Sequence, residues 1–211
     1  MRAADGATYF RVALGIFAAY LIIIKSNPIL IALLIAVTMI LDAVDGYLAV
    51  WQASKGRVSL IDYLRSAAGN AKYAKQIKAI KQKVSESARF GPRIDIAGDR
   101  VVEYVFWITY SFVNVIPLFV LILIVIRHSF VDAFMAARGT SSKMKTRFAQ
   151  VVFASNLWRS GINVVKFLAF SYLAFVYVWA YPAWIGYVLV TILVAYILLR
   201  GAAEIYDSVK E

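Results

Sequence analysis

Cysteine is absent from the 211-residue sequence, and histidine occurs only once. The lack of cysteine excludes disulfide bonds, thiolate metal sites and a thiol nucleophile. Acidic residues are also scarce, with 12 against 23 lysines and arginines, so that the formal net charge is +11. With no thiolate and a single imidazole, a metal site would depend on carboxylate oxygens, which suit hard divalent cations such as Mg²⁺, Mn²⁺ or Ca²⁺ better than zinc or copper.

Long apolar stretches fill most of the chain. Hydrophobic residues make up 62% of the sequence, compared with roughly half of an ordinary soluble domain. About 20 mostly apolar residues suffice to cross a bilayer as a helix, whereas the strands of a β-barrel would alternate apolar and polar residues. We therefore predict an all-α, polytopic integral membrane helix bundle with about six transmembrane helices, at Tyr9–Ile24, Pro28–Val50, Ile94–Val113, Ile116–Ala137, Gln150–Ala180 and Ala183–Asp207. The first stretch lacks a small-residue cleavage site, so we expect it to remain as a membrane helix.

Positive charge is concentrated in two connectors. Ten of the 23 lysines and arginines lie within residues 55–93 and five within residues 127–147, whereas the other connectors carry one in total. By the positive-inside rule, the two basic connectors and both termini are predicted to face the cytoplasm from a multi-pass protein of the cell membrane. The same distribution argues against nucleic acid as a partner, because nucleic-acid binding requires a soluble basic face.

Residues 51–90 form a predicted cytoplasmic insertion between the second and third membrane helices. Within residues 71–88, apolar residues recur at helical spacing and lysines fill the other faces. This pattern is typical of a basic amphipathic helix on an anionic membrane surface, with a solvated loop helix as the alternative. Residues 59–63 are a candidate start for another short helix. Because no repeat or low-complexity linker divides the sequence, we predict a single membrane-embedded domain over residues 1–211.

Four aspartates interrupt the apolar pattern at the cytoplasmic ends of the second and third predicted helices. Asp42 and Asp45 are three residues apart, and Asp95 and Asp99 are four apart, so each pair lies on one helical face. An ionisable residue at mid-bilayer costs about 2.5–3.5 kcal/mol, and four together need a compensating role. If the two helices pack together, the four carboxylates converge on a site for divalent metal.

Two alternatives remain open for these aspartates. They could extend towards the interface and pair with Arg93 and Arg100. They could also form the acidic intramembrane site of a divalent-cation transporter or channel. Neighbouring glycines favour a ligand site, because Gly46, Gly91 and Gly98 would let a ligand or a helix approach the backbone closely.

Together, Asp42-Ala-Val-Asp45-Gly46-Tyr-Leu-Ala49 and Gly91-Pro-Arg-Ile-Asp95-Ile-Ala-Gly98-Asp99 resemble the signature of the CDP-alcohol phosphatidyltransferase family. That signature reads D-x-x-D-G-x-x-A-R, followed by G-x-x-x-D-x-x-x-D. Residues 5–11, Asp5-Gly-Ala-Thr8-Tyr-Phe-Arg11, are similar to the family's opening N-x-x-T-x-x-R. The sequence departs from the family in two places, since Val50 replaces the motif arginine and residues 51–90 lengthen the gap between the motif halves. Lys55 and Arg57 are candidates for the missing cation.

The resemblance implies an enzyme of phospholipid biosynthesis that moves a phosphatidyl-type group from a CDP-linked lipid, of CDP-diacylglycerol or CDP-archaeol type, to an alcohol, with release of CMP. It also implies dependence on Mg²⁺ or Mn²⁺, with two ions, and a lipid-embedded chain that could form a homodimer. By analogy, Asp42, Asp45, Asp95 and Asp99 are metal ligands and Asp99 is the general base. The CDP-binding residues implied in the same way are Asp45, Gly46, Ala49, Gly91, Thr8 and Asp5.

The acceptor alcohol is a phosphorylated polyol, such as inositol phosphate or glycerol phosphate, in one branch of the family. Residues 129–139 look like a segment of that branch. Four arginines are candidates for holding the acceptor phosphate, with the alternative that they are ordinary charges of cytoplasmic connectors: Arg93, Arg138, Arg147 and Arg159.

Overall fold

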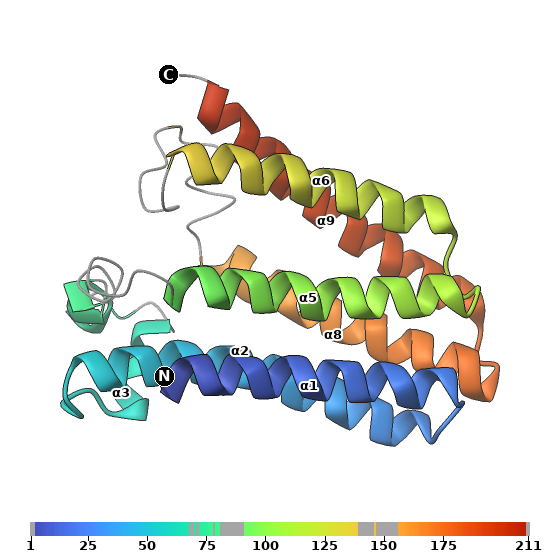
Figure 1. The fold of residues 1–211 in the computed structure, drawn as a ribbon, viewed down its shortest axis with the longest axis horizontal. Coiled ribbons are helices and arrows are strands. Elements are labelled where there is room, and N and C mark those ends of the chain that lie inside the picture. Colours follow the sequence, from blue (N-terminus) through green and yellow to red (C-terminus); the bar gives the residue numbers. More distant parts are fainter. Residues whose placement is uncertain are drawn as a thin grey trace. The chain divides into compact units, whose positions relative to one another are not determined.

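The structure is a computed structural model that describes residues 3–67, 70, 72–77, 79–80, 91–138, 146 and 156–209. These residues form helices and their connections, with no β-strand among them, so the predicted all-α class is confirmed. In chain order (Figure 1) the helices are α1 (Ala3–Ile23), α2 (Pro28–Ala53), α3 (Leu60–Ala67), α5 (Gly91–Phe112), α6 (Leu118–Arg138), α8 (Asn156–Trp179) and α9 (Ala183–Val209).

The short connectors end their helices by local backbone chemistry. After α1, Lys25 adopts a left-handed conformation with φ of 52°, and the amide of Ser26 donates to the carbonyl of Leu21 at 2.9 Å. The side-chain oxygen of Asn27 then accepts from the amide of Ile29 at 2.9 Å, which caps α2 just before its first residue, Pro28. Asn114 ends α5 in a similar left-handed conformation, with φ of 58°. These turns allow consecutive helices to reverse direction within a few residues.

Four helices of the described part of the chain are long and apolar enough to cross a membrane. The four segments are Asp5–Ile23, Pro28–Ala53, Gly161–Trp179 and Ala183–Val209. They correspond to four of the six predicted spans, while a membrane-crossing role for α5 and α6 stays a prediction. The helix α1 begins at Ala3, before the predicted Tyr9, because its polar first turns take part in the acidic site described below.

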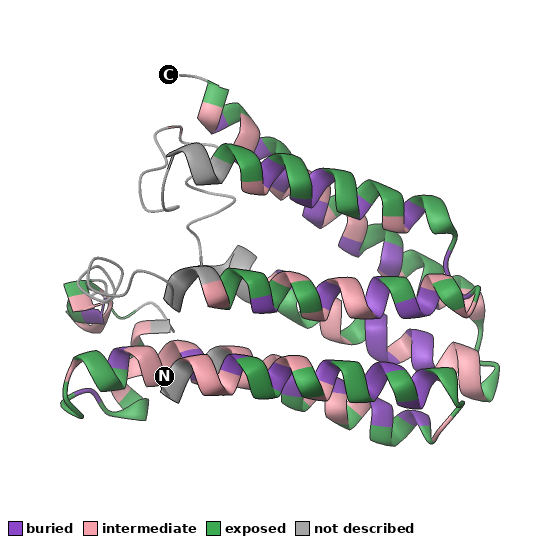
Figure 2. Cartoon of the chain, in the orientation of Figure 1, coloured by how far each residue is buried: buried purple, intermediate pink, exposed green. Residues whose placement is uncertain are grey.

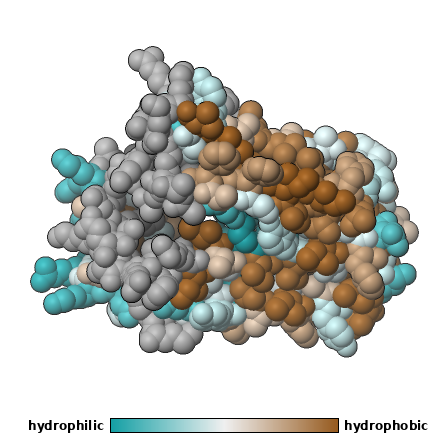
Figure 3. Space-filling model, turned by 45° about the horizontal axis from the view of Figure 1, so that its top comes forward, coloured by the Kyte–Doolittle hydropathy of each residue, from teal (hydrophilic) through white to brown (hydrophobic). Residues whose placement is uncertain are grey.

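Large apolar side chains lie on the outside of these helices. Leu33, Ile40, Phe119 and Trp184 are each more than half exposed, and brown hydrophobic atoms cover much of the face seen in Figure 3. Exposure of so large an apolar surface to water would be energetically unfavourable. The surface is therefore consistent with a membrane protein.

The chain forms two compact units, and each is described separately. Unit 1 comprises Met1–Tyr20 and Leu33–Phe106, and unit 2 comprises Leu21–Ala32 and Trp107–Glu211. The helices α1, α2 and α5 contribute residues to both units. The predicted single domain stays a prediction.

In unit 1, part of the predicted insertion packs against the end of α2. Val50, Val58 and Ile77 form a buried cluster, with Tyr63 and Ile80 packed against it. The short helix expected near residues 59–63 is α3, and the hydroxyl oxygen of Ser59 accepts from the amide of Asp62 to cap it. Residues 72–77 are helical, as predicted. Ile77 and Ile80, two apolar positions of the predicted amphipathic helix, pack against the protein. Residues 71, 78 and 81–88 of this predicted helix lie outside the described residues.

In unit 2, α6 and α9 are joined by a buried arginine. The Nε of Arg127 donates to the carbonyl of Ile197 at 3.1 Å, and its Nη2 donates to the carboxylate of Glu204, also at 3.1 Å. Arg200 contacts the other oxygen of Glu204 at 3.3 Å. The guanidinium fits because Gly201 has no side chain, since a Cβ there would lie 2.5 Å from the Nε of Arg127. Figure 2 shows buried segments in purple along both helices.

We expect Gly201→Ala to destabilise the protein by about 1–3 kcal/mol, because the added methyl group overlaps a guanidinium that is fixed by two hydrogen bonds. Thermal melting in detergent micelles measures the effect as a lower Tm. Gly6→Ala is the matched control, because a Cβ at that position of α1 meets no atom within 4 Å. A Tm for Gly201→Ala equal to that of Gly6→Ala would contradict the proposed overlap.

We also expect Ile77→Ser to release the segment around it from α2, because removing a buried isoleucine costs about 2–5 kcal/mol. Limited trypsin digestion checks this through faster cleavage after Lys72 and Lys75. The control is Ile61→Ser, in which the replaced side chain is 61% exposed and the cleavage rate should stay at the wild-type value. Equal rates in both variants would show that the packing of Ile77 does not hold the segment.

Candidate functional site

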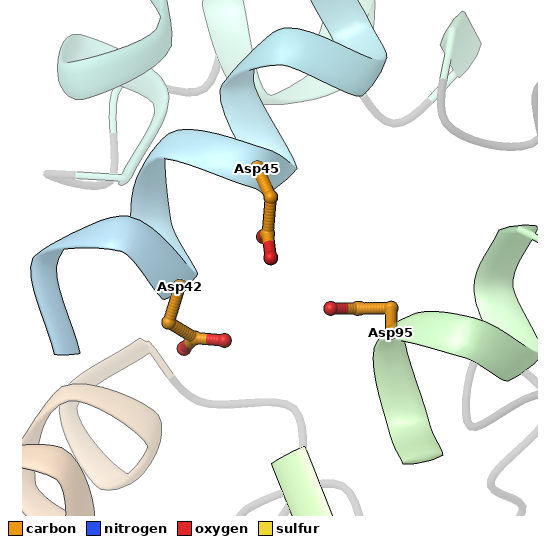
Figure 4. Close-up of side chains that lie close together, drawn as sticks. All are labelled: Asp42, Asp45 and Asp95. Atoms are coloured by element: carbon orange, nitrogen blue, oxygen red, sulfur yellow. The ribbon is translucent and has the colours of Figure 1, made fainter. Parts of the chain in front are cut away.

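The acidic residues of α2 and α5 converge in unit 1. Asp42 and Asp45 lie one turn apart on α2, and Asp95 extends from the first turns of α5 towards them (Figure 4). One carboxylate oxygen of each lies within 4.8 Å of the others. The structure therefore brings together residues that are about fifty positions apart in the chain, as the predicted packing of these helices requires.

Arg11 of α1 lies among these carboxylates. Its Nη1 forms an ion pair with Asp42, and its Nη2 lies 3.9 Å from Asp45 and 3.8 Å from Asp95. The same Nη2 is 2.7 Å from an oxygen of Asp99. Asp99 therefore belongs to the cluster through the arginine, and all four predicted aspartates lie within 4 Å of one guanidinium.

The close approach of α1 to α5 depends on Gly98. A Cβ on this glycine would lie 2.3 Å from the side-chain methyl of Thr8 and 3.3 Å from the Nη2 of Arg11. Thr8 is buried, and its hydroxyl donates to Asp45 at 3.2 Å. Two turns after Thr8 on α1, Gly15 faces Val102, where a Cβ would make ordinary contact at 3.5 Å. Of the two predicted reasons for a glycine here, approach of a ligand or of a helix, the structure shows the approach of a helix.

The cluster is asymmetric in its exposure. The side chains of Arg11 and Asp45 are 3% and 5% exposed, whereas those of Asp95 and Asp99 are 52% and 49% exposed. One face is therefore embedded between α1 and α2, and the side formed by α5 is accessible. An ion or a polar substrate can reach Asp95 and Asp99 without passing through the buried residues.

Negative charge exceeds positive charge among these residues. Two carboxylates about 4 Å apart repel each other by about 4 kcal/mol at an effective dielectric constant of 20, and a single guanidinium compensates one of four negative charges. The Nε and Nη2 of Arg11 are buried without a hydrogen-bond partner among the described residues. The contact of Nη2 with Asp99, at 2.7 Å, is an ion pair. This arrangement favours binding of additional cations.

The donor set fits a hard divalent cation. All its ligand atoms are carboxylate oxygens, which Mg²⁺, Mn²⁺ and Ca²⁺ prefer. Oxygens on opposite sides of one Mg²⁺ are about 4.2 Å apart, and those around Ca²⁺ are up to about 5.2 Å apart. The 4.8 Å span of Asp42, Asp45 and Asp95 matches the Ca²⁺ range and needs a shift of less than about 1 Å for Mg²⁺, which rotation of an exposed carboxylate can supply.

The residues predicted to bind CDP lie at several places in unit 1. Thr8 and Asp45 are in the cluster, and Asp5 lies one turn before Thr8 on α1. Tyr63 lies close to Gly46. A Cβ added to this glycine would lie 2.9 Å from the hydroxyl of Tyr63. Tyr63 belongs to α3, and its ring packs edge-on against Tyr47 at 5.6 Å between centroids.

Two other CDP-site candidates lie near helix ends. Ala49 is half-buried in the last turns of α2, and Gly91 is the first residue of α5. Val50, which stands where the family has an arginine, is fully buried beneath Val58 and Ile77. The candidates for holding an acceptor phosphate cannot be placed at this site: Arg147 lies outside the described residues, and Arg93, Arg138 and Arg159 lie in helical turns whose side chains are not described.

Sequence reasoning did not assign a role to Arg11 or to Tyr63. A signal for Arg11 was present, because it follows Thr8 by three residues on one face of an otherwise apolar helix, and a cation in such a helix requires a partner. For Tyr63 there was no signal, since its contact with Gly46 depends on how a loop folds back onto α2.

Comparison with known proteins gives no relative, since the chain matches no family model, no curated protein and no solved structure.

We expect Gly98→Ala to lower stability, because the methyl group would force Thr8 and Arg11 away from α5. Thermal melting in detergent measures the effect as a lower Tm. Gly15→Ala is the control at the same pair of helices, and it should behave like wild type because Val102 leaves room for the methyl group. A Tm for Gly98→Ala equal to that of Gly15→Ala would show that the close approach of α1 at Gly98 does not stabilise the protein.

Proposed function

We propose that this chain is a divalent-metal-dependent CDP-alcohol phosphotransferase, a phosphatidyltransferase of phospholipid biosynthesis. The observation that carries the proposal is the convergence of Asp42 and Asp45 with Asp95. These residues come from the two halves of the motif that resembles the CDP-alcohol phosphatidyltransferase signature, and the halves are separated by residues 51–90. Both the residue spacing within each half and the proximity of the two halves support this proposed function.

The chemistry of the site suits transfer of a phosphatidyl-type group. Mg²⁺ or Mn²⁺ ions, two in the proposed enzyme, supply charge that stabilises the pyrophosphate and the leaving CMP. Asp42, Asp45 and Asp95 hold these ions, and Thr8 fixes the orientation of Asp45 through its hydroxyl. Asp99 is the proposed general base and a further ligand, and its half-exposed carboxylate is accessible to a polar alcohol.

In the proposed reaction, the acceptor hydroxyl oxygen attacks the phosphorus atom of the phosphatidyl group. A carboxylate oxygen of Asp99 takes the hydroxyl proton. The bond between that phosphorus and the bridging pyrophosphate oxygen breaks, and CMP leaves with the electron pair. The products are the phosphatidyl alcohol and CMP.

The membrane setting gives the donor and the acceptor separate routes. The lipid tails of a CDP-diacylglycerol or CDP-archaeol donor would lie among apolar helices, which the exposed surface of α2 accommodates. CMP and a polar acceptor, such as a phosphorylated polyol, would exchange through the accessible side formed by Asp95 and Asp99. We place that side towards the cytoplasm of a cell-membrane protein because the basic connectors follow the same ends of the helices.

The test is release of CMP from CDP-diacylglycerol or CDP-archaeol by purified protein, screened against inositol phosphate, glycerol phosphate and unphosphorylated alcohols. We expect release only with Mg²⁺ or Mn²⁺, and we expect Asp99→Asn to lower kcat by about 10²-fold or more, because it removes the general base. The control is Asp62→Asn, an aspartate of α3 whose partners are Ser59 and Arg65. Metal-independent release, or normal turnover by folded Asp99→Asn, would contradict the assignment.

A further inference from the structure

We propose that Arg11 is a positioning residue that occupies the place of a divalent cation among the four aspartates, so that contact of Arg11 with the carboxylates and binding of metal there exclude each other. The inference rests on the metal site of the proposed function and adds to it a role for a residue of α1. In this inference, Arg11 and a divalent cation compete for the same carboxylate oxygens.

The first support is the position of the guanidinium. Its two terminal nitrogens lie within 4 Å of oxygens from all four aspartates. The oxygens of Asp42, Asp45 and Asp95 are themselves within 4.8 Å of one another, so there is no room for a divalent cation and a guanidinium side by side at their centre. A cation that these oxygens coordinate must therefore displace the arginine from at least two of them.

The second support is that part of the guanidinium lacks hydrogen-bond acceptors. Its Nε and Nη2 are buried without a hydrogen-bond partner in the described part of the chain, and an unsatisfied buried donor raises the free energy of the state that contains it. Arg127, which is also buried, differs in this respect, because its Nε and Nη2 both donate to oxygens of α9. Arg127 has the contacts of a structural arginine, whereas Arg11 has those of a counterion.

The third support is the route by which the exchange can occur. Asp95 and Asp99 are half exposed, and a third of the Asp42 side chain is exposed, so a cation reaches the carboxylates from the accessible side while Arg11 lies on the buried side. Arg11 thus keeps the carboxylates close together, and it is the group that an entering cation replaces. A guanidinium suits this role because it remains charged at every physiological pH.

The decisive experiment compares Arg11→Gln with Arg65→Gln, a control in which the replaced arginine is exposed and its nearest acidic partner is Asp62 at 3.9 Å. Mn²⁺ affinity is measured by electron paramagnetic resonance in detergent without lipid donor, and Tm is measured in EDTA and in saturating Mn²⁺. We expect Arg11→Gln to bind Mn²⁺ about tenfold more tightly than wild type, because a competing positive charge is removed. We also expect it to melt lower in EDTA and to gain more in Tm from Mn²⁺. The control should match wild type in both measurements.

Unchanged or weaker Mn²⁺ binding by Arg11→Gln would overturn the proposal. If this variant does not fold in EDTA, Arg11→Lys serves as the second variant, since a shorter cation with fewer donors should give an affinity between those of wild type and Arg11→Gln. Failure of both variants to fold even with Mn²⁺ present throughout would overturn it as well, because Arg11 would then be a purely structural residue.

The two proposals fail in distinguishable ways. Metal-dependent CMP release by wild type, together with unaltered Mn²⁺ affinity in Arg11→Gln, would overturn only the role of Arg11. Absence of Mn²⁺ binding from wild type and Arg11→Gln alike would overturn both, and Asp45→Asn provides the reference for a protein in which the cluster has lost a ligand.

Discussion

The arrangement of unit 1 depends on charge compensation at Arg11. Three helices meet where one guanidinium lies within 4 Å of four carboxylates, and without a cation at that point the like charges would force α2 and α5 apart. The same requirement explains the small residue at Gly98, which lets α1 approach closely enough for the arginine to reach. The position of Arg11 and the close packing of α1 at Gly98 therefore both follow from the need to compensate the charge of the four carboxylates.

Much of this architecture is encoded locally and could be predicted. Apolar length identified the helices, and the spacing of Asp42 with Asp45 and of Asp95 with Asp99 placed each pair on one helical face. The junction of the pairs could be expected only if the helices packed together, and the identity of the compensating cation could not be predicted from Arg93 and Arg100, which are nearer in sequence. It comes from α1, because a contact between helices depends on packing that no local pattern records.

Arg11 and Arg127, both buried, show how differently an apolar protein can use the same side chain. Arg127 donates to a backbone carbonyl and a carboxylate of α9, and its contacts are of the kind that fix two helices together. Arg11 meets more carboxylates with fewer hydrogen bonds. The hydrogen bonds of Arg127 fix it between two helices, whereas the contacts of Arg11 with Asp45, Asp95 and Asp99 are ion pairs.

Val50 lies at the point where the sequence departs from the motif that it resembles. Its side chain is fully buried beneath residues of the segment that lengthens the gap between the motif halves, so an arginine at this position would lie under that segment and lose its contact with water. Val50 and the residues that cover it therefore pack as one group. An engineered exchange of this region would consequently need to move Val50 together with residues 51–90.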